Sequence, residues 1–239
     1  MSPALETTRV AIITGVSGGI GAGLAAAFRA TGYRVVGTSR SMPASDDPDF
    51  LTVNGDITHA ETAERVVGQA LERFGRIDSL INMAGIYIGK PFTEYTAADF
   101  SAMTAVNLAG FFHITQRVIA QMVAQGSGHV VNITASLVED ADSTRPSALA
   151  ALTKGGLAAV TRSLAVEYAA RGVRVNAVAP GIIETPVHDA ASYEGLAALH
   201  PLGRVGEISD VVDGILYLER ATFVTGEILH IDGGQAAGH

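Results

Sequence analysis

The chain has 239 residues, of which 48% are hydrophobic and 27 are glycines, a balance typical of a globular α/β protein. The net charge of −8, with 16 scattered Lys and Arg residues, argues against nucleic-acid binding, which demands a basic surface. The absence of cysteine excludes disulfides, thiolate catalysis and cysteine-ligated zinc. No signal peptide and no apolar run long enough to span a membrane are evident, so we expect a cytoplasmic protein. One domain, residues 1–239, is the simplest organisation.

A glycine-punctuated stretch near the start joins a β-branched run to an alanine-rich run. The first run, residues 9–13, predicts a buried strand, and the second, residues 21–30, predicts a helix packed on the sheet. Glycines at such a junction suit a sharp turn and a close approach of a diphosphate to the helix N-terminus. An ordinary strand–turn–helix with flexible glycines is the alternative. The candidate cofactor-binding residues are Gly15, Ser17, Gly19, Ile20 and Gly21.

The second predicted strand, residues 34–38, ends in Ser39 and Arg40. In dinucleotide-binding folds an acidic residue near this point binds the ribose 2′-hydroxyl of NAD, and none is present here. A small hydroxyl beside a guanidinium suits a 2′-phosphate. We therefore expect NADP(H) in preference to NAD(H), with a solvated surface arginine as the alternative.

The third predicted strand, residues 50–54, leads to Asp56 and Ile57. Asp56 has two interpretations: it accepts a hydrogen bond from an adenine amino group, or it caps the amphipathic helix predicted over residues 58–74. The fourth strand, residues 77–81, is followed by small residues that let a cofactor lie over the sheet. These residues are Asn82, Ala84 and Gly85.

The remaining elements continue the alternation of strand and helix. One long helix or two over residues 96–125 contain Asn107, which is unfavourable in mid-helix unless its amide is used. Strands at 128–133, 173–178 and 226–231 alternate with helices at 146–171, which carries Lys154, and 208–219. The pattern predicts a Rossmann-type three-layer α/β/α fold. Its doubly wound parallel sheet of about seven strands binds ligands at the strands' carboxyl ends.

Taken together, these stretches resemble the short-chain dehydrogenase/reductase family over essentially the whole chain. The matching residues are Thr14-Gly15-x-x-x-Gly19-Ile20-Gly21, Asn82-x-Ala84-Gly85, Asn107, Pro180-Gly181-x-Ile183-x-Thr185, Thr225-Gly226 and Asp232-Gly233-Gly234. The resemblance implies hydride transfer between a nicotinamide and a carbonyl or alcohol. It adds cofactor contacts from Pro180, Gly181, Ile183 and Thr185. It also implies a substrate-covering segment at about 186–205 and a homo-oligomer, tetramer or dimer, built through the two long helices.

The family's catalytic residues are matched only in part. A Tyr-x-x-x-Lys pair is expected on the long helix, with the lysine lowering the tyrosine's pKa and binding the nicotinamide ribose. Lys154 fits the lysine, but Ala150 stands at the tyrosine position. Ala135 stands at the usual position of the serine that polarises the substrate carbonyl. Ser136, one step along, or Thr134 is the candidate to reach the carbonyl in its place through a loop adjustment. Asn107 fits the family asparagine, which holds a proton-relay water.

Three hypotheses remain open. Another group supplies the proton, or a bound water does so with help from Lys154, or the protein is a catalytically silent dinucleotide-binding sensor or subunit. The leading donor candidates are His188 and Tyr193. Weaker ones are Tyr87, Tyr95, Glu139, Asp140 and Asp142. The seven histidines show no metal-ligand spacing, so we expect no metal. The substrate is expected to be a partly apolar carbonyl or alcohol.

Overall fold

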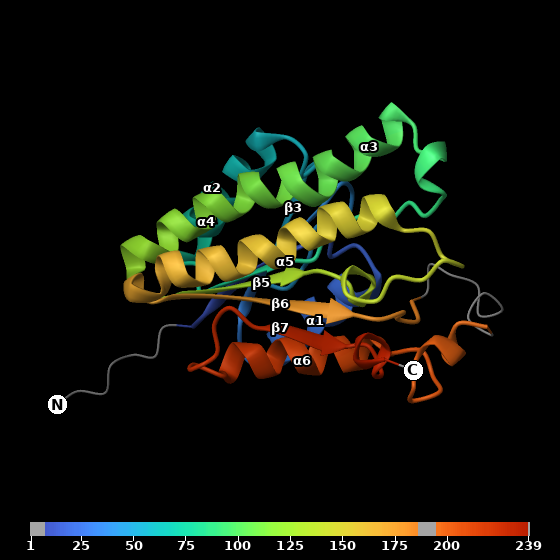
Figure 1. The fold of residues 1–239 in the computed structure, drawn as a ribbon. Coiled ribbons are helices and arrows are strands. Elements are labelled where there is room, and N and C mark those ends of the chain that lie inside the picture. The colour runs from blue at the N-terminus through green and yellow to red at the C-terminus, as the bar shows by residue number, and fades with distance from the viewer. Residues whose placement is uncertain (1–7, 186–194, 239) are drawn as a thin grey trace.

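The computed structural model describes residues 8–185 and 195–238, which form a parallel sheet between two layers of helices (Figure 1). The seven strands lie in the order β3-β2-β1-β4-β5-β6-β7. Because the order reverses between β1 and β4, a topological switch point lies there, and a ligand site is expected at its carboxyl end. The strands are β1 (Val10–Thr14), β2 (Arg34–Ser39), β3 (Phe50–Asn54), β4 (Ser79–Asn82), β5 (Gly128–Ile133), β6 (Val173–Pro180) and β7 (Ile228–Ile231).

Helices cover both faces of the sheet. Along β1, Val10 and Ile12 belong to one hydrophobic cluster, whereas Ala11 and Ile13 belong to the other, because successive side chains of a strand point to opposite faces. The first cluster is covered by α2 (Ala60–Phe74), α4 (Phe111–Gln125) and α5 (Ala148–Tyr168), and the second by α1 (Gly19–Ala30) and α6 (Ile208–Arg220). The doubly wound α/β prediction is confirmed.

The stretch expected as one or two helices over residues 96–125 is interrupted. It consists of α3 (Ala97–Thr104), a π-helical turn (Ala105–Gly110) and α4. Asn107 lies in the π turn, a feature that appears frequently at functional sites. The unfavourable position of this asparagine in the sequence thus corresponds to a π-helical turn between two α-helices.

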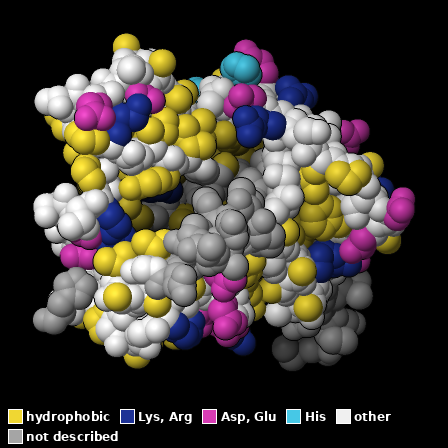
Figure 2. Space-filling view, turned by 90° about the vertical axis from the view of Figure 1, so that its right-hand side faces the viewer, with side chains coloured by type: hydrophobic (Ala, Val, Ile, Leu, Met, Phe, Trp, Pro, Cys, Tyr) yellow, Lys and Arg dark blue, Asp and Glu magenta, His cyan; other side chains and the backbone are white. Residues whose placement is uncertain are grey.

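The carboxyl ends of the strands face one side of the molecule, at the right of Figure 1 and toward the viewer in Figure 2. The connections that leave β1, β2, β4, β5 and β6 meet at this edge. The strands begin at the opposite edge, where β1 starts at Val10 (Figure 1). Within the described ranges, no helix combines the length and the apolar character needed to cross a membrane.

Candidate active site

The loop between β1 and α1 is shaped for a backbone-bound anion. Gly15 and Gly19 adopt φ angles of 75° and 53°, a region that favours glycine. A side chain at Gly21 would overlap the Gly15 carbonyl oxygen. Gly18 precedes the helix without a side-chain cap, so the positive end of α1 faces the loop. Ser17 is exposed at this turn and Ile20 is half-buried. The loop thus offers N–H groups and a helix dipole to a diphosphate.

At the end of β2 two hydroxyls lack partners. The Oγ1 atom of Thr38 and the Oγ atom of Ser39 are buried and find no hydrogen-bond partner among the described residues. A buried donor without a partner costs about 1–3 kcal/mol, so such a group is commonly satisfied by a ligand or water. Arg40 follows as an exposed cation. Because successive side chains of a strand point to opposite faces, only one of the two hydroxyls can reach a given ligand, and that of Ser39, one residue before Arg40, fits a ribose phosphate.

Asp56 lies after β3 and folds its carboxylate back on its own loop. Its Oδ1 atom accepts a hydrogen bond from the Thr58 backbone at 2.9 Å, and the hydrogen bonds from Thr58 lower the pKa of the carboxyl. The N-cap position of α2 is His59, whose side chain makes no capping hydrogen bond, so the interpretation of Asp56 as the helix cap is wrong. The adenine-binding role stays a prediction. Its neighbour Ile57 packs against Gly110, where an added Cβ would lie 2.9 Å from Ile57 Cγ2.

Asn82, the last residue of β4, and Ala84, in the loop that follows, are both held by hydrogen bonds within the protein. Asn82 is buried, and its amide donates to Thr115 Oγ1 and Asn132 Oδ1, both at 2.9 Å. Its side chain therefore braces the sheet, and only its backbone can face a cofactor. The Ala84 backbone N–H donates to Thr14 Oγ1 at 2.9 Å, which holds this loop against the glycine loop.

Lys154 and Asn107 meet at Gly85. A Cβ added at Gly85 would lie 3.1 Å from Lys154 Nζ and 3.3 Å from Asn107 Oδ1. Lys154 Nζ donates to the Ile133 carbonyl at 2.7 Å, and burial lowers the pKa of its ammonium to about 8. The lysine therefore places a cation at the carboxyl edge of β5, beside the loop that follows β4.

The Asn107 amide is engaged at both ends by protein atoms. Its Oδ1 accepts from Ile86 N at 2.9 Å, and its Nδ2 donates to Ile86 O at 3.0 Å and to Thr153 Oγ1 at 3.1 Å. The family's relay-water role of Asn107 stays a prediction. The two bonds to Ile86 fix the position of the loop after β4.

The two positions that differ from the family pattern, Ala135 and Ala150, carry no polar side chain, and the neighbouring Ser136 hydroxyl is engaged within the protein. Ala150 is 2% exposed and packs with Met103 and Leu149. Ser136 is also 2% exposed, and its hydroxyl is hydrogen-bonded to the Pro180 carbonyl at 3.2 Å and to Gln235 Oε1 at 3.1 Å. Pro180 and Gln235 thus engage this hydroxyl within the protein. The predicted contact between Ser136 and a substrate carbonyl stays a prediction.

A cavity of about 750 Å³ opens at this edge of the sheet, and Figure 2 shows the face hollowed beside the residues drawn in grey. Its volume is that of a small-molecule site. The apolar wall consists of Leu137, Ala148, Ala151, Ile182, Ile183 and Leu196, and the polar wall of Tyr87, Asp140, Asp142, Arg145 and Ser147. Asp142 and Arg145 form an ion pair at 2.9 Å, so the free charge on this wall is negative.

The chain after β6 links this cavity to the cofactor loop. Thr185 lies over the glycine loop, with its Cγ2 atom 3.5 Å from a Cβ built at Gly19. Gly181 leaves room for the buried His200, whose Nε2 accepts from Ile182 N at 3.1 Å. Ile183 is buried and forms a bridge to Gly206. The candidate donors His188 and Tyr193 lie outside the described residues.

Several contributors carry no signal in the sequence. Ser147, Arg145, His200 and Gln235 belong to no recurring pattern. Only the structure draws attention to them, since Arg145 and Ser147 line the cavity, Gln235 bonds Ser136 and His200 bonds Ile182. Tyr87 is visible in the sequence as one of several weaker donor candidates, and the structure places it on the cavity wall. In the parts of the chain that the structure describes, no group of His, Asp and Glu side chains is arranged to hold a metal ion.

Comparison with known proteins agrees with this arrangement. A family model described as "Enoyl-(Acyl carrier protein) reductase" matches residues 15–236. The 3-oxoacyl-[acyl-carrier-protein] reductase FabG of Thermotoga maritima is 34% identical, over 95% of this chain and 97% of that protein.

Solved structures give the same result. ElxO with NADP bound superposes with a TM-score of 0.90 at 31% identity, covering 97% of this chain and 100% of ElxO. The 3-ketoacyl-(acyl-carrier-protein) reductase from Brucella melitensis complexed with NADH has a TM-score of 0.87 at 29% identity, with coverages of 95% and 98%. The fold and site define a nicotinamide-dependent oxidoreductase. The chain belongs to the short-chain dehydrogenase/reductase family.

Proposed function

We propose that this protein is an NADP(H)-dependent oxidoreductase that acts on a partly apolar carbonyl or alcohol and uses a non-standard proton donor. The observation that carries the proposal is the meeting of Lys154 and Gly85 at the carboxyl edge of a sheet whose first loop fits a diphosphate. Tyr87 and Ala151, close to them in the chain, line a cavity of about 750 Å³. The orphan hydroxyl of Ser39 next to Arg40 supports NADP(H) over NAD(H). ElxO, which binds NADP, supports the same choice.

The proposed cofactor contacts follow the carboxyl edge of the sheet. When bound, the cofactor supplies or accepts the hydride at its nicotinamide. Lys154 holds the nicotinamide ribose and places a positive charge near the carbonyl oxygen, where negative charge develops. The contributing residues are Gly15, Ser17, Gly19, Ile20 and Gly21 for the diphosphate, Ser39 and Arg40 for the 2′-phosphate, Asp56 and Ile57 for adenine, and the backbones of Asn82, Ala84, Gly85, Pro180, Gly181, Ile183 and Thr185 for the remainder.

The relatives suggest which carbonyl to test first. The Thermotoga maritima and Brucella melitensis proteins are named for 3-oxoacyl and 3-ketoacyl groups carried on acyl carrier protein. A 3-oxoacyl thioester combines a ketone with an apolar chain, and Leu137, Ile182 and Leu196 offer that chain an apolar wall. We propose this substrate class within one domain of residues 1–239, in which residues 186–205 cover the substrate.

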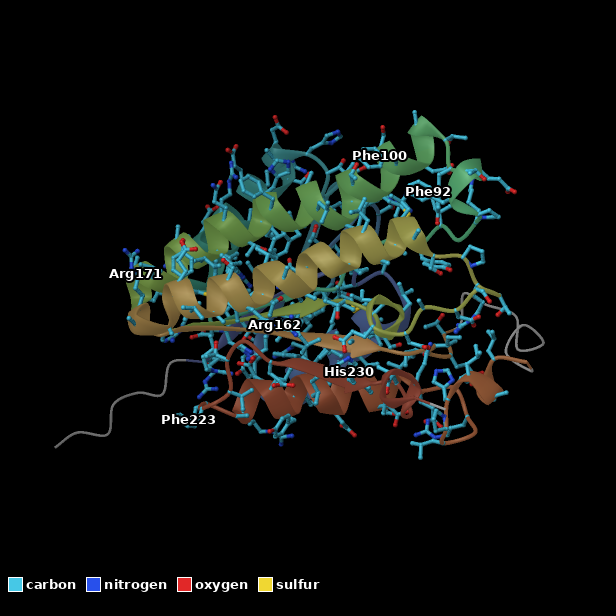
Figure 3. All side chains as sticks on the ribbon, viewed as in Figure 1. Phe92, Phe100, Arg162, Arg171, Phe223 and His230 are labelled. Carbon is cyan, nitrogen blue, oxygen red and sulfur yellow. The ribbon has the colours of Figure 1, made fainter. Side chains whose placement is uncertain are left out.

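A homo-oligomer, tetramer or dimer, completes the proposal. Leu152 and Val166 on α5 and Phe112 on α4 expose 59%, 83% and 54% of their surface, so these helices present apolar side chains to a second copy. Phe223, which precedes β7, is fully exposed and lies at the opposite end of the molecule from Phe92 (Figure 3), which suits a second contact.

The test is NADPH oxidation with three carbonyls: acetoacetyl-N-acetylcysteamine, cyclohexanone and benzaldehyde. Lys154→Ala should lower turnover at least about 100-fold, because a positioned group of this kind contributes about 10²–10⁴-fold. Lys90→Ala is the matched control and should leave turnover unchanged. Lys90 is the other lysine of the chain, and its ammonium pairs with Asp99 of α3 at 2.9 Å.

A second candidate function is a silent NADP(H)-binding protein. The observation that favours it is Ala150, whose methyl group is buried among Met103 and Leu149 where the family's acid would stand. Calorimetry of NADPH binding, together with the turnover assay, separates the two functions. Tight NADPH binding with no turnover of any of the three carbonyls would support the silent binder and refute the oxidoreductase.

A further inference from the structure

The hydroxyl groups near the cavity are few, and most are already engaged. Tyr95 packs against the cluster around Ala150, but its hydroxyl donates to the Ile88 carbonyl at 2.8 Å and is not part of the cavity wall. Ser136 is committed to Pro180 and Gln235. Among the residues that the structure describes, the phenol on the cavity wall is that of Tyr87.

The backbone that carries Tyr87 is held on both sides. Asn107 binds both the N–H and the carbonyl of the preceding residue, Ile86. One residue earlier, Gly85 lies against Lys154 Nζ. On the other side a Cβ at Gly89 would overlap the Tyr87 hydroxyl, so a glycine leaves the room that the phenol occupies. Tyr87 is therefore fixed to the loop that touches the lysine.

The Tyr87 hydroxyl lies 2.9 Å from Ser147 Oγ, and either oxygen can donate in this pair. Ser147 Oγ also lies 2.7 Å from the Arg145 carbonyl, to which it donates. Tyr87 then donates to Ser147 in the resting state. If the phenol loses its proton, rotation of the Ser147 hydroxyl supplies a hydrogen bond to the phenolate.

The Tyr87 hydroxyl contacts the residue that precedes α5, while the same cavity wall also carries the carboxylate of Asp140. Ser147 is the N-cap residue of α5, and its side chain makes no capping bond. The positive end of the helix dipole stabilises an anion at that position by about 0.3–1 kcal/mol. In addition, Tyr87 is 57% exposed, so water can return a proton to it.

We infer that Tyr87 is the proton donor that replaces the family's tyrosine, with Ser147 as its hydrogen-bond partner. The inference rests on the proposed function. In the reduction, the carbonyl carbon accepts a hydride from NADPH, which is oxidised to NADP⁺. The carbonyl oxygen takes the proton of the Tyr87 hydroxyl, so that an alcohol forms, and the phenolate regains a proton from water. Oxidation of the alcohol follows the reverse course.

Tyr87→Phe keeps the ring and removes the acid, and Tyr95→Phe is the matched control. With acetoacetyl-N-acetylcysteamine, kcat of Tyr87→Phe should fall about 10²–10⁴-fold, the usual loss of a positioned acid. The Kd for NADPH, followed by its fluorescence, should not change. The Kd of the alcohol product for the NADP⁺ complex, measured by calorimetry, should rise roughly three- to tenfold, the equivalent of one hydrogen bond. Tyr95→Phe should match the wild type in all three measurements.

The outcomes separate the inference from the function. Wild-type turnover together with undiminished kcat in Tyr87→Phe refutes the inference and leaves the proposed function standing. An equal loss in Tyr95→Phe also refutes it, because that hydroxyl lies outside the cavity wall. A wild type that oxidises no NADPH with any of the three carbonyls refutes the proposed function, and the inference with it.

Discussion

Replacing Glu219 by Gln should destabilise the fold by an amount that the structure allows us to work out. Glu219 lies on α6 and is 8% exposed. Its carboxylate accepts hydrogen bonds from Tyr33 Oη at 2.9 Å, Ser79 Oγ at 2.6 Å and His129 Nδ1 at 2.7 Å. The last two donors come from the amino ends of β4 and β5, the edge opposite the cofactor loop, so the change should spare the active site.

The protonation of His129 follows from its second partner. The Glu227 N–H donates to Asn176 Oδ1 at 3.0 Å, which fixes the orientation of that amide. Asn176 Nδ2 therefore faces His129 Nε2, at 3.0 Å, and Nε2 must accept. The proton is on Nδ1, from which it is donated to Glu219. Burial lowers the pKa of His129 although Glu219 acts to raise it, so the ring is neutral.

A glutamine at position 219 cannot serve all three donors. If its oxygen faces Tyr33 and Ser79, its NH₂ group meets the His129 N–H; if it is flipped, the two hydroxyl protons lose their acceptor. Either way at least one buried donor is unpaired, which costs about 1–3 kcal/mol. Urea unfolding measures the loss. Glu64→Gln, at an exposed carboxylate paired with Arg117, is the control and should cost less than about 1 kcal/mol.

The same cluster makes stability depend on pH with a definite sign. The folded-state pKa of His129 is below its ordinary 6.5, so below that pH the unfolded chain binds more protons. The free energy of unfolding should then fall on acidification, by up to about 1.4 kcal/mol per pH unit. Although burial acts to raise the pKa of Glu219, hydrogen bonds from His129, Ser79 and Tyr33 hold it below 4.5. Its contribution is present above pH 4.5 and lost below.

An equal free energy of unfolding for Glu219→Gln and Glu64→Gln would refute this reasoning. It would mean that His129 exchanges its tautomer freely or that water enters the cluster. The difference between wild type and Glu219→Gln should also shrink below pH 4.5, as the carboxylate protonates. A difference that stays constant down to pH 3 would contradict the assignment of an ionised Glu219.

Two further predictions concern the cofactor and the assembly. Arg40→Ala should weaken NADPH binding roughly tenfold to a hundredfold, because a charge-assisted hydrogen bond contributes about 1.5–3 kcal/mol, and it should leave NADH binding unchanged. Calorimetry measures both affinities. Equal losses for the two cofactors would refute the assignment of Arg40 to the 2′-phosphate. Leu152→Glu, at a side chain 59% exposed on α5, should shift a homo-oligomer toward the monomer in light scattering, since it buries a charge in the interface; an unchanged mass would rule out an α5 contact.

The parts of the site that depend on local backbone chemistry were predictable from the sequence. Glycine is needed where φ is positive or the backbone approaches another chain segment, so the loop around Gly15 and Gly21 could be assigned its geometry from residue types alone. The strands β3 and β5 begin and end at the expected residues, because both are short β-branched runs with clear turn signals.

The parts that depend on contacts between distant segments were not predictable. Asp56 precedes a helical run in the sequence, yet its carboxylate accepts a hydrogen bond from the Thr58 backbone, and the N-cap position of α2 is His59. Tyr87 and Ser147 are 60 residues apart, and nothing in either neighbourhood indicates that they meet. The orphan hydroxyl of Ser39 is likewise a consequence of packing.

Moving the proton donor from α5 to the loop after β4 changes which contacts fix its position relative to Lys154. In the family arrangement the tyrosine and lysine share one helical turn, so the helix itself fixes their separation. Here the helix carries only Lys154, and Tyr87 depends on the bonds between Asn107 and Ile86. The π turn at Ala105–Gly110 brings the Asn107 amide to that loop, and the same side chain meets Thr153, the neighbour of Lys154. Asn107 thus connects the two halves of the proton-transfer site, which makes it the positioning residue on which a relocated acid depends.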